Sequence, residues 1–169
     1  MQTELTLSIG GLPPLSARGC VQDLKPVAQG ELKRTLNGEL LFVGHAAHKY
    51  RSTLRCTDQT AMATDGLPVG AEVVVGCIQP LCQKVGAHGG VITVTLDRLP
   101  VEGSVSVIDD NKKPLEGVTV AGRTVTLPGS ERDVFIFYNP QLTMRVLSFS
   151  LQTDEWSQKA SWTLDLEEI

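Results

Sequence analysis

The stretch that decides the fold is ELKRTLNGELLFV, residues 31–43, in which two strand-like runs flank an Asn-Gly pair. Asn37 and Gly38 can both adopt the positive φ angles of a type I′ turn, whose twist matches that of two antiparallel strands. The sequence therefore predicts a β-hairpin closed by a two-residue turn at these positions.

A period of two residues continues along most of the chain. Residues 49–56 place Tyr50, Ser52, Leu54 and Cys56 on one face of a strand and their neighbours on the other. Residues 159–167 repeat this alternation, and turn-forming residues separate about ten such segments. We therefore expect an all-β protein, built as an antiparallel β-barrel or sandwich of about ten strands.

A segment rich in structure-breaking residues follows the first alternating run. Residues 10–19, GGLPPLSARG, contain Pro13 and Pro14 and cannot continue a strand. We expect a long N-terminal loop there. It is either a plain surface connection or an arm that reaches a neighbouring subunit.

The domain organisation is expected to be one β domain over residues 1–169. The glycine-rich stretch KVGAHGG, residues 84–90, is the best candidate for an internal boundary. It would divide the chain into a barrel-like part, residues 1–86, and a second β part, residues 91–169.

Composition narrows the classes of function. A formal net charge of -4 and a pI near 5.3 argue against a protein whose main task is to bind phosphate backbones. The N-terminus alternates polar and apolar residues and predicts no export signal, and no apolar run is long enough to predict a membrane-spanning helix. The four cysteines are accordingly expected to be reduced thiols.

Signatures of catalysis are missing from the sequence. It contains no nucleophile elbow, phosphate-binding loop, dinucleotide fingerprint or His-Glu-x-x-His motif. The acidic pairs at 109–110 and 167–168 are typical of a solvated turn and a solvated terminus. We therefore predict a protein that is not an enzyme, with no catalytic residues and no cofactor.

Soft metal ligands offer one alternative. Cys77 and Cys82, with Cys20 and Cys56 elsewhere, could bind zinc or an iron–sulfur cluster, and the histidines at 45, 48 and 88 add further donors. Structural zinc sites usually combine two closely spaced ligand pairs, and no second pair of similar spacing occurs here. We favour the cysteines as small apolar residues and keep a small metal-binding protein as a second alternative.

Several side chains are candidates for contacts with partners. Lys49, Arg51 and Arg55, with Lys33 and Arg34 on the hairpin before them, would form a cationic strip on the face opposite Tyr50. The strip suits a salt-bridged subunit contact or plain solvation better than nucleic acid, because no aromatic platform accompanies it. Trp156 and Trp162 are more often core or interface anchors than platforms for sugar rings. A carbohydrate-binding or adhesion module, with Trp156, Trp162 or Tyr138 as an exposed ring platform, nevertheless remains the first alternative function.

Four segments carry a resemblance to a known family. They are residues 49–59 (KYRSTLRCTDQ), 65–70 (DGLPVG) with the valine-rich run ending at Cys77, 138–146 (YNPQLTMRV) and 161–168 (SWTLDLEE). Together they resemble the tail-tip or baseplate (minor tail) structural proteins of long-tailed, non-contractile bacteriophages. Residues 101–132 resemble only generic immunoglobulin-like hairpins and are a candidate insertion.

The resemblance implies a non-enzymatic structural component of the virion. Such a protein would be made in the cytoplasm of the bacterial host and would assemble as a ring around the tail axis, linking the tail tube to hub or fibre proteins. Its partners would be copies of itself and other tail proteins, with no membrane anchor. DNA would at most pass through a lumen, for which the acidic balance is suited.

Overall fold

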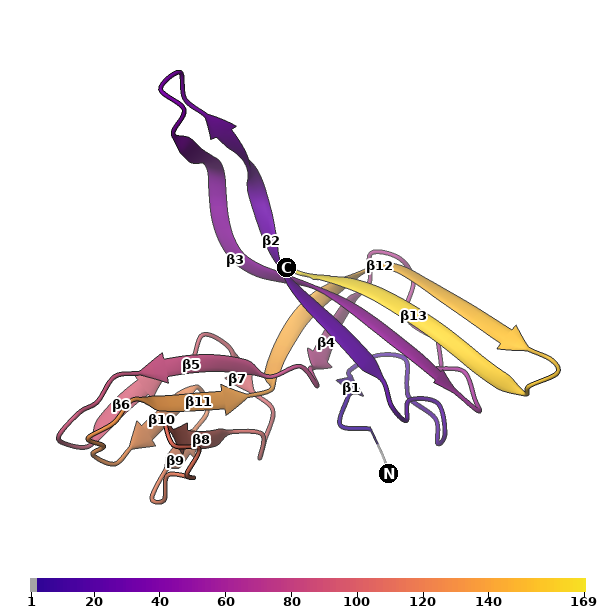
Figure 1. The fold of residues 1–169 in the computed structure, drawn as a ribbon. Helices are drawn as coiled ribbons and strands as arrows, with labels where there is room; N and C mark the ends of the chain where they lie inside the picture. Colours follow the sequence, from indigo (N-terminus) through magenta and orange to yellow (C-terminus); the bar gives the residue numbers. More distant parts are fainter. Residues whose placement is uncertain (1–2) are drawn as a thin grey trace. The chain divides into compact units, whose positions relative to one another are not determined.

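The computed structural model describes residues 3–169, with the side chains at 28–29 and 45–47 left out. All of its regular structure is β, as the sequence predicts (Figure 1). The described chain contains no helical segment with the length and apolarity of a membrane span. The strands are β1 (Thr6–Leu7), β2 (Val21–Arg34), β3 (Leu40–Asp58), β4 (Glu72–Gly76), β5 (Leu81–Val85), β6 (Ile92–Thr95), β7 (Leu99–Pro100), β8 (Ser106–Asp109), β9 (Thr119–Ala121), β10 (Thr124–Leu127), β11 (Val134–Tyr138), β12 (Pro140–Asp154) and β13 (Lys159–Glu168).

The chain divides into two compact units. The first contains Ile9–Val73 and Thr143–Ile169, and the second contains residues 3–8 and Val74–Leu142. The boundaries therefore fall near residues 73 and 142 and not at the glycine-rich stretch 84–90, which lies inside the second unit. The glycines of residues 84–90 indicate a flexible loop. A unit boundary depends instead on which strands pair with one another.

The first unit is built on an antiparallel sheet in the order β12, β13, β3 and β2. Its core face carries the even-numbered residues of β3 and β13, as the alternation predicts. Leu54, Leu164 and Leu166 are fully buried there. Residues Ala17, Met62 and Leu67, from the loops that precede β2 and follow β3, are also buried and complete the apolar interior of this unit.

The second unit is a small β-sandwich. One three-stranded antiparallel sheet has the order β5, β11, β8, and the other has the order β6, β10, β9. Buried residues from both sheets form one cluster, as expected for two sheets packed face to face. The cluster contains Leu96, Val107, Val125, Leu127, Val134, Ile136 and Tyr138.

Residues 101–132 are an integral part of this sandwich. They supply β8 to one sheet, and β9 and β10 to the other. Val107 and Val125 from this segment are both buried in the shared cluster. The segment is therefore not a separable insertion, because removing it would take strands from both sheets.

We predict a large difference in stability between two leucine truncations on the same strand. Leu54 of β3 is 0% exposed and Leu41 of β3 is 50% exposed. Leu54→Ala should lower the free energy of unfolding by about 2–5 kcal/mol, because it leaves a cavity in the core. Leu41→Ala should change it by less than about 0.5 kcal/mol. Urea denaturation of both variants tests this; equal losses would contradict the description of β3.

Candidate assembly interface

The most unusual surface of the molecule is the outer part of the β2–β3 hairpin. β3 pairs with β13 only from Arg51 to Asp58, whereas its pairing with β2 continues to Leu40. The two strands therefore extend together beyond the part of β3 that belongs to the sheet (Figure 1). We call residues 30–44 of this hairpin the arm.

The turn at the end of the arm differs from the predicted one. Gly38 has a φ of 84°, but Asn37 is not among the residues with positive φ, so a type I′ turn is excluded. The Gly38 N–H donates to the Thr35 carbonyl at 2.9 Å, and the Thr35 N–H donates to the Glu39 carbonyl at 2.9 Å. This is a three-residue loop closed by a left-handed glycine. The hairpin prediction is confirmed, and its two-residue turn is wrong.

Large apolar side chains on the arm are exposed to solvent. Leu36 at the turn is fully exposed, and five others keep between 43% and 65% of their surface accessible. Solvent-exposed strands normally place polar residues on at least one face. The arm does not follow this pattern, and its apolar members are Leu32, Leu36, Leu40, Leu41, Phe42 and Val43.

Both faces of the arm are apolar along β3. Leu32 lies opposite Phe42 and shares one face with it, while Val43 lies opposite Glu31 and shares the other. The charged residues of the arm are on β2 and, for Glu39, in the loop, and on β2 Lys33 and Glu31 form an exposed ion pair of 3.5 Å. An apolar strand with this pattern is typical of a position buried on both sides.

The arm also offers open strand edges. In the described pairings, β2 is the last strand of its sheet, and residues 40–44 of β3 pair with β2 alone. Unpaired backbone donors and acceptors along a strand edge are a template for pairing with another chain. The arm therefore combines exposed apolar side chains with backbone edges that can accept a further strand.

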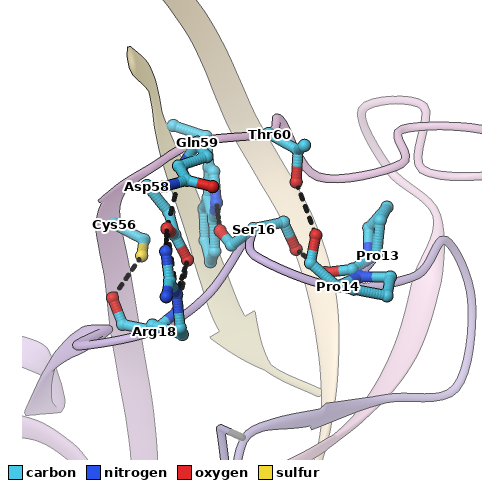
Figure 2. Close-up of polar contacts among 9 residues, drawn as sticks. Pro13, Pro14, Ser16, Arg18, Cys56, Asp58, Gln59 and Thr60 are labelled. Carbon is cyan, nitrogen blue, oxygen red and sulfur yellow. Dashed lines mark hydrogen bonds and ion pairs between the residues drawn. The ribbon is translucent and has the colours of Figure 1, made fainter. Parts of the chain in front are cut away.

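A polar network holds the base of the hairpin (Figure 2). The guanidinium of Arg18 forms an ion pair with Asp58, with Nη2 and Oδ1 2.7 Å apart. The backbone N–H groups of Arg18 and Gln59 also donate to this carboxylate, at 2.9 Å and 2.8 Å. The hydrogen bond from Arg18 is the largest of the effects that hold the pKa of Asp58 well below its usual range.

The proline-containing loop is fastened to the same place. Thr60 Oγ1 donates to the Pro14 carbonyl at 2.9 Å, and Ser16 Oγ donates to the Pro13 carbonyl at 2.7 Å (Figure 2). Trp162 Nε1 donates to the Ser16 carbonyl at 2.7 Å. Pro13 and Pro14 are exposed, but their loop is held by its own chain. These contacts favour the surface-connection reading of this segment.

A carboxylate lies within the predicted cationic strip. Arg51 and Arg55 are exposed on one face of β3, and Asp165 lies opposite Thr53, between them. Thr53 Oγ1 donates to Asp165 at 2.6 Å, and this hydrogen bond, with smaller effects from Ser148 and the two arginines, lowers the pKa of Asp165. Tyr50 is half-buried on the opposite face, and its N–H donates to Glu168 at 3.0 Å.

The two tryptophans lie in different environments. Trp156, in the turn between β12 and β13, is 95% exposed, and Trp162 is 2% exposed. Trp162 is therefore a core residue and not an interaction site, which corrects its place among the candidates. Parity assigned it to a face of β13 but could not say that this face meets the core.

The proposed metal ligands do not converge. Cys20 and Cys56 belong to the first unit, and Cys77 and Cys82 belong to the second. Among the side chains that the structure describes, no three His, Cys, Asp or Glu residues are grouped to hold a metal ion. His48 is exposed, the ring of His88 contacts backbone carbonyls at 2.9 Å and 3.0 Å, and the side chain at 45 lies outside the described part.

The acidic pairs have structural contacts. Asp109 accepts hydrogen bonds from the N–H groups of Asn111 and Lys113, at 2.9 Å and 2.8 Å, and so stabilises a turn. Asp110 forms an exposed ion pair with Arg132. An open hollow of the second unit, lined by residues 99–103 and their neighbours, has one ionisable side chain, Glu102, among its lining residues. Those residues offer no acid–base pair.

Comparison with known proteins adds no family. No model of a protein family matches this sequence, and a search of curated proteins gives no match. The candidate site therefore depends on the geometry of the arm and of its base. The sequence predicted this hairpin but not its role as a contact surface, although the uninterrupted apolar run at 40–43 was a detectable signal.

We predict that Asp58 makes the stability of the first unit depend on acidic pH. Because its pKa is lowered on folding, its contribution is complete above the unfolded value of about 3.9 and is lost as the pH falls below it. Urea denaturation from neutral pH down to about pH 3 should show a smaller loss for Asp58→Asn than for the wild type. Asp23→Asn, at an exposed position of β2, should keep the wild-type dependence. A slope unchanged by Asp58→Asn would contradict this role.

Proposed function

We propose that this chain is a non-enzymatic structural component of a phage tail tip or baseplate. In this proposal it assembles as a ring around the tail axis and links the tail tube to hub or fibre proteins. The observation that carries the assembly part is the apolar arm with its open strand edges. The phage part rests on the sequence resemblance of residues 49–59, 65–70, 138–146 and 161–168.

The size of the apolar surface supports self-assembly. Six large apolar side chains of the arm are exposed. Their combined area is on the order of 500 Å², comparable with the largest apolar patch on a typical monomer. A standard interface buries about 800 Å² on each partner, so the arm together with a strand edge could supply most of one.

The charges on the first sheet also favour the arm as the surface that drives assembly. The exposed face of the first sheet places Asp165 between Arg51 and Arg55, and Glu167 opposite Arg51, so charges of both signs are interspersed on it. A solvated face of this kind contributes little to association. The driving force for assembly is thus concentrated in the arm.

Mass photometry of the purified full chain tests the proposal directly. The protein would be measured alone and then with the tail-tube and hub proteins encoded beside it. A closed ring, or recruitment into one, is the expected result. A persistent monomer that binds none of these proteins would overturn the proposal.

We predict that the arm can be disabled without unfolding the protein. Replacing Phe42 and Val43, one on each face, with Thr keeps a good strand former and removes apolar surface. Self-association should weaken at least tenfold, measured as the concentration at which the oligomer forms. The control is Val69→Thr with Val91→Thr, two exposed valines outside the arm. Equal weakening in the control would contradict the assignment of the interface.

The alternative of a carbohydrate-binding module now depends on one residue. Trp156 is exposed, and the other aromatic candidates, Trp162 and Tyr138, are buried. Glycan-array binding that Trp156→Ala abolishes, in a protein that remains monomeric, would replace the structural proposal with this alternative. No binding to glycans is expected.

A further inference from the structure

Two cysteines that are far apart in the sequence lie opposite one another at the base of the hairpin. Val21 pairs with Arg55, and Gln22 pairs with Leu54. Extending this antiparallel register by one residue places Cys20, directly before β2, opposite Cys56 of β3. Burial and then the neighbouring Cys56 raise the pKa of Cys20, and Cys56 Sγ donates to the Arg18 carbonyl at 3.4 Å (Figure 2).

This placement fits the geometry of a disulfide. Directly opposed residues of antiparallel strands have Cα atoms about 4.5–5.5 Å apart. Disulfide-bonded cysteines have Cα atoms about 4.4–6.8 Å apart, with their Cβ atoms facing each other. A bond between Cys20 and Cys56 therefore requires little movement of the backbone.

Solvent reaches the pair through Cys20. Cys20 is half-buried, and Cys56 is buried. Glutathione disulfide is an oxidant that exchanges with a partly exposed thiol of this kind.

We propose that Cys20 and Cys56 are a redox modification site, which closes to a reversible intrachain disulfide with glutathione disulfide as the oxidant. The Cys20 thiolate attacks one glutathione sulfur, forms a mixed disulfide and releases one glutathione. The Cys56 thiolate then attacks the Cys20 sulfur and releases the second glutathione. Two protein thiols are oxidised, one glutathione disulfide is reduced to two glutathiones, and the two protons pass to the released glutathione thiolates.

The raised pKa values of the two cysteines determine how fast the disulfide forms. Burial, followed by the neighbouring Cys56, raises the pKa of Cys20 to about 12, and burial also raises the pKa of Cys56. Thiolates are the reacting species, so both cysteines are mostly unreactive near neutral pH. The pair therefore stays reduced in a reducing cytoplasm and closes slowly in an oxidising medium, faster as the pH rises.

Closure would join the two strands at the base of the hairpin that carries the arm. The bond would link the residue before β2 to the end of β3, so residues 20–56, including the whole arm, would lie within one covalent loop. A link of this kind mainly restricts the unfolded chain. It would hold edge strand β2 to β3 where Arg18 and Asp58 already fasten the neighbouring loop. This inference goes beyond the proposed function and does not depend on it.

The test is thiol counting on the native full chain, incubated near pH 8.5 with glutathione disulfide and then denatured. The protein has four free cysteines, and two of them, Cys20 and Cys56, should lose their thiols to an intrachain bond that adds no glutathione mass, apart from any glutathione that the exposed Cys82 takes up. Peptide mapping should give a linked Cys20–Cys56 pair, and the oxidised protein should melt roughly 5 °C or more above the reduced one. Cys20→Ser and Cys20→Ala should form no intrachain disulfide and should show no such rise.

Cys82→Ser is the matched control, because Cys82 is the exposed cysteine of the second unit. It should still form the Cys20–Cys56 link at the wild-type rate. Glutathione that remains attached to Cys20 without transfer to Cys56 would overturn the proposal. So would a map in which both residues stay reduced while Cys82 alone is modified.

Discussion

The structure of the first unit depends on the long antiparallel pairing of β2 with β3, which is interrupted by one shift of register between Val27 and Gln29. Inside the sheet, β3 has a neighbour on each edge, and its core face carries buried Leu54. Beyond Arg51 the same strand keeps only β2, yet its sequence becomes more apolar. A strand that is more apolar where it is less covered indicates a surface that another molecule covers.

The base of the hairpin is fastened to the first unit by polar contacts. Arg18 and Asp58 join the N-terminal loop to the end of β3, and the Ser16 carbonyl accepts a hydrogen bond from Trp162 in the core. A buried carboxylate needs such partners, because an unpaired one is costly to remove from water. The proline-containing loop of residues 10–19 therefore stabilises the protein's own fold, while the arm supplies the exposed apolar surface.

Part of this structure could be predicted from the local pattern of polar and apolar residues. Alternation identified the strands, and the buried residues of β13, Trp162 and Leu164 among them, lie on the face that parity gave them. The contacts at the base of the hairpin could not be predicted from the sequence, because Arg18 and Asp58 are separated by 40 residues and no sequence motif links them. The two-unit organisation was missed for the same reason, since strand order is not encoded in periodicity.

The distance in sequence between β3 and β13 has a consequence for the order of folding. In the first unit, β3 lacks its neighbour β13, and Ser16 lacks the Trp162 indole 146 residues later, until β13 has been synthesised. The strands of the second unit's two sheets all precede β13 in the sequence, so their pairing does not wait for it. The apolar hairpin is thus made before the strand that anchors it, and the nascent chain must remain soluble throughout that interval.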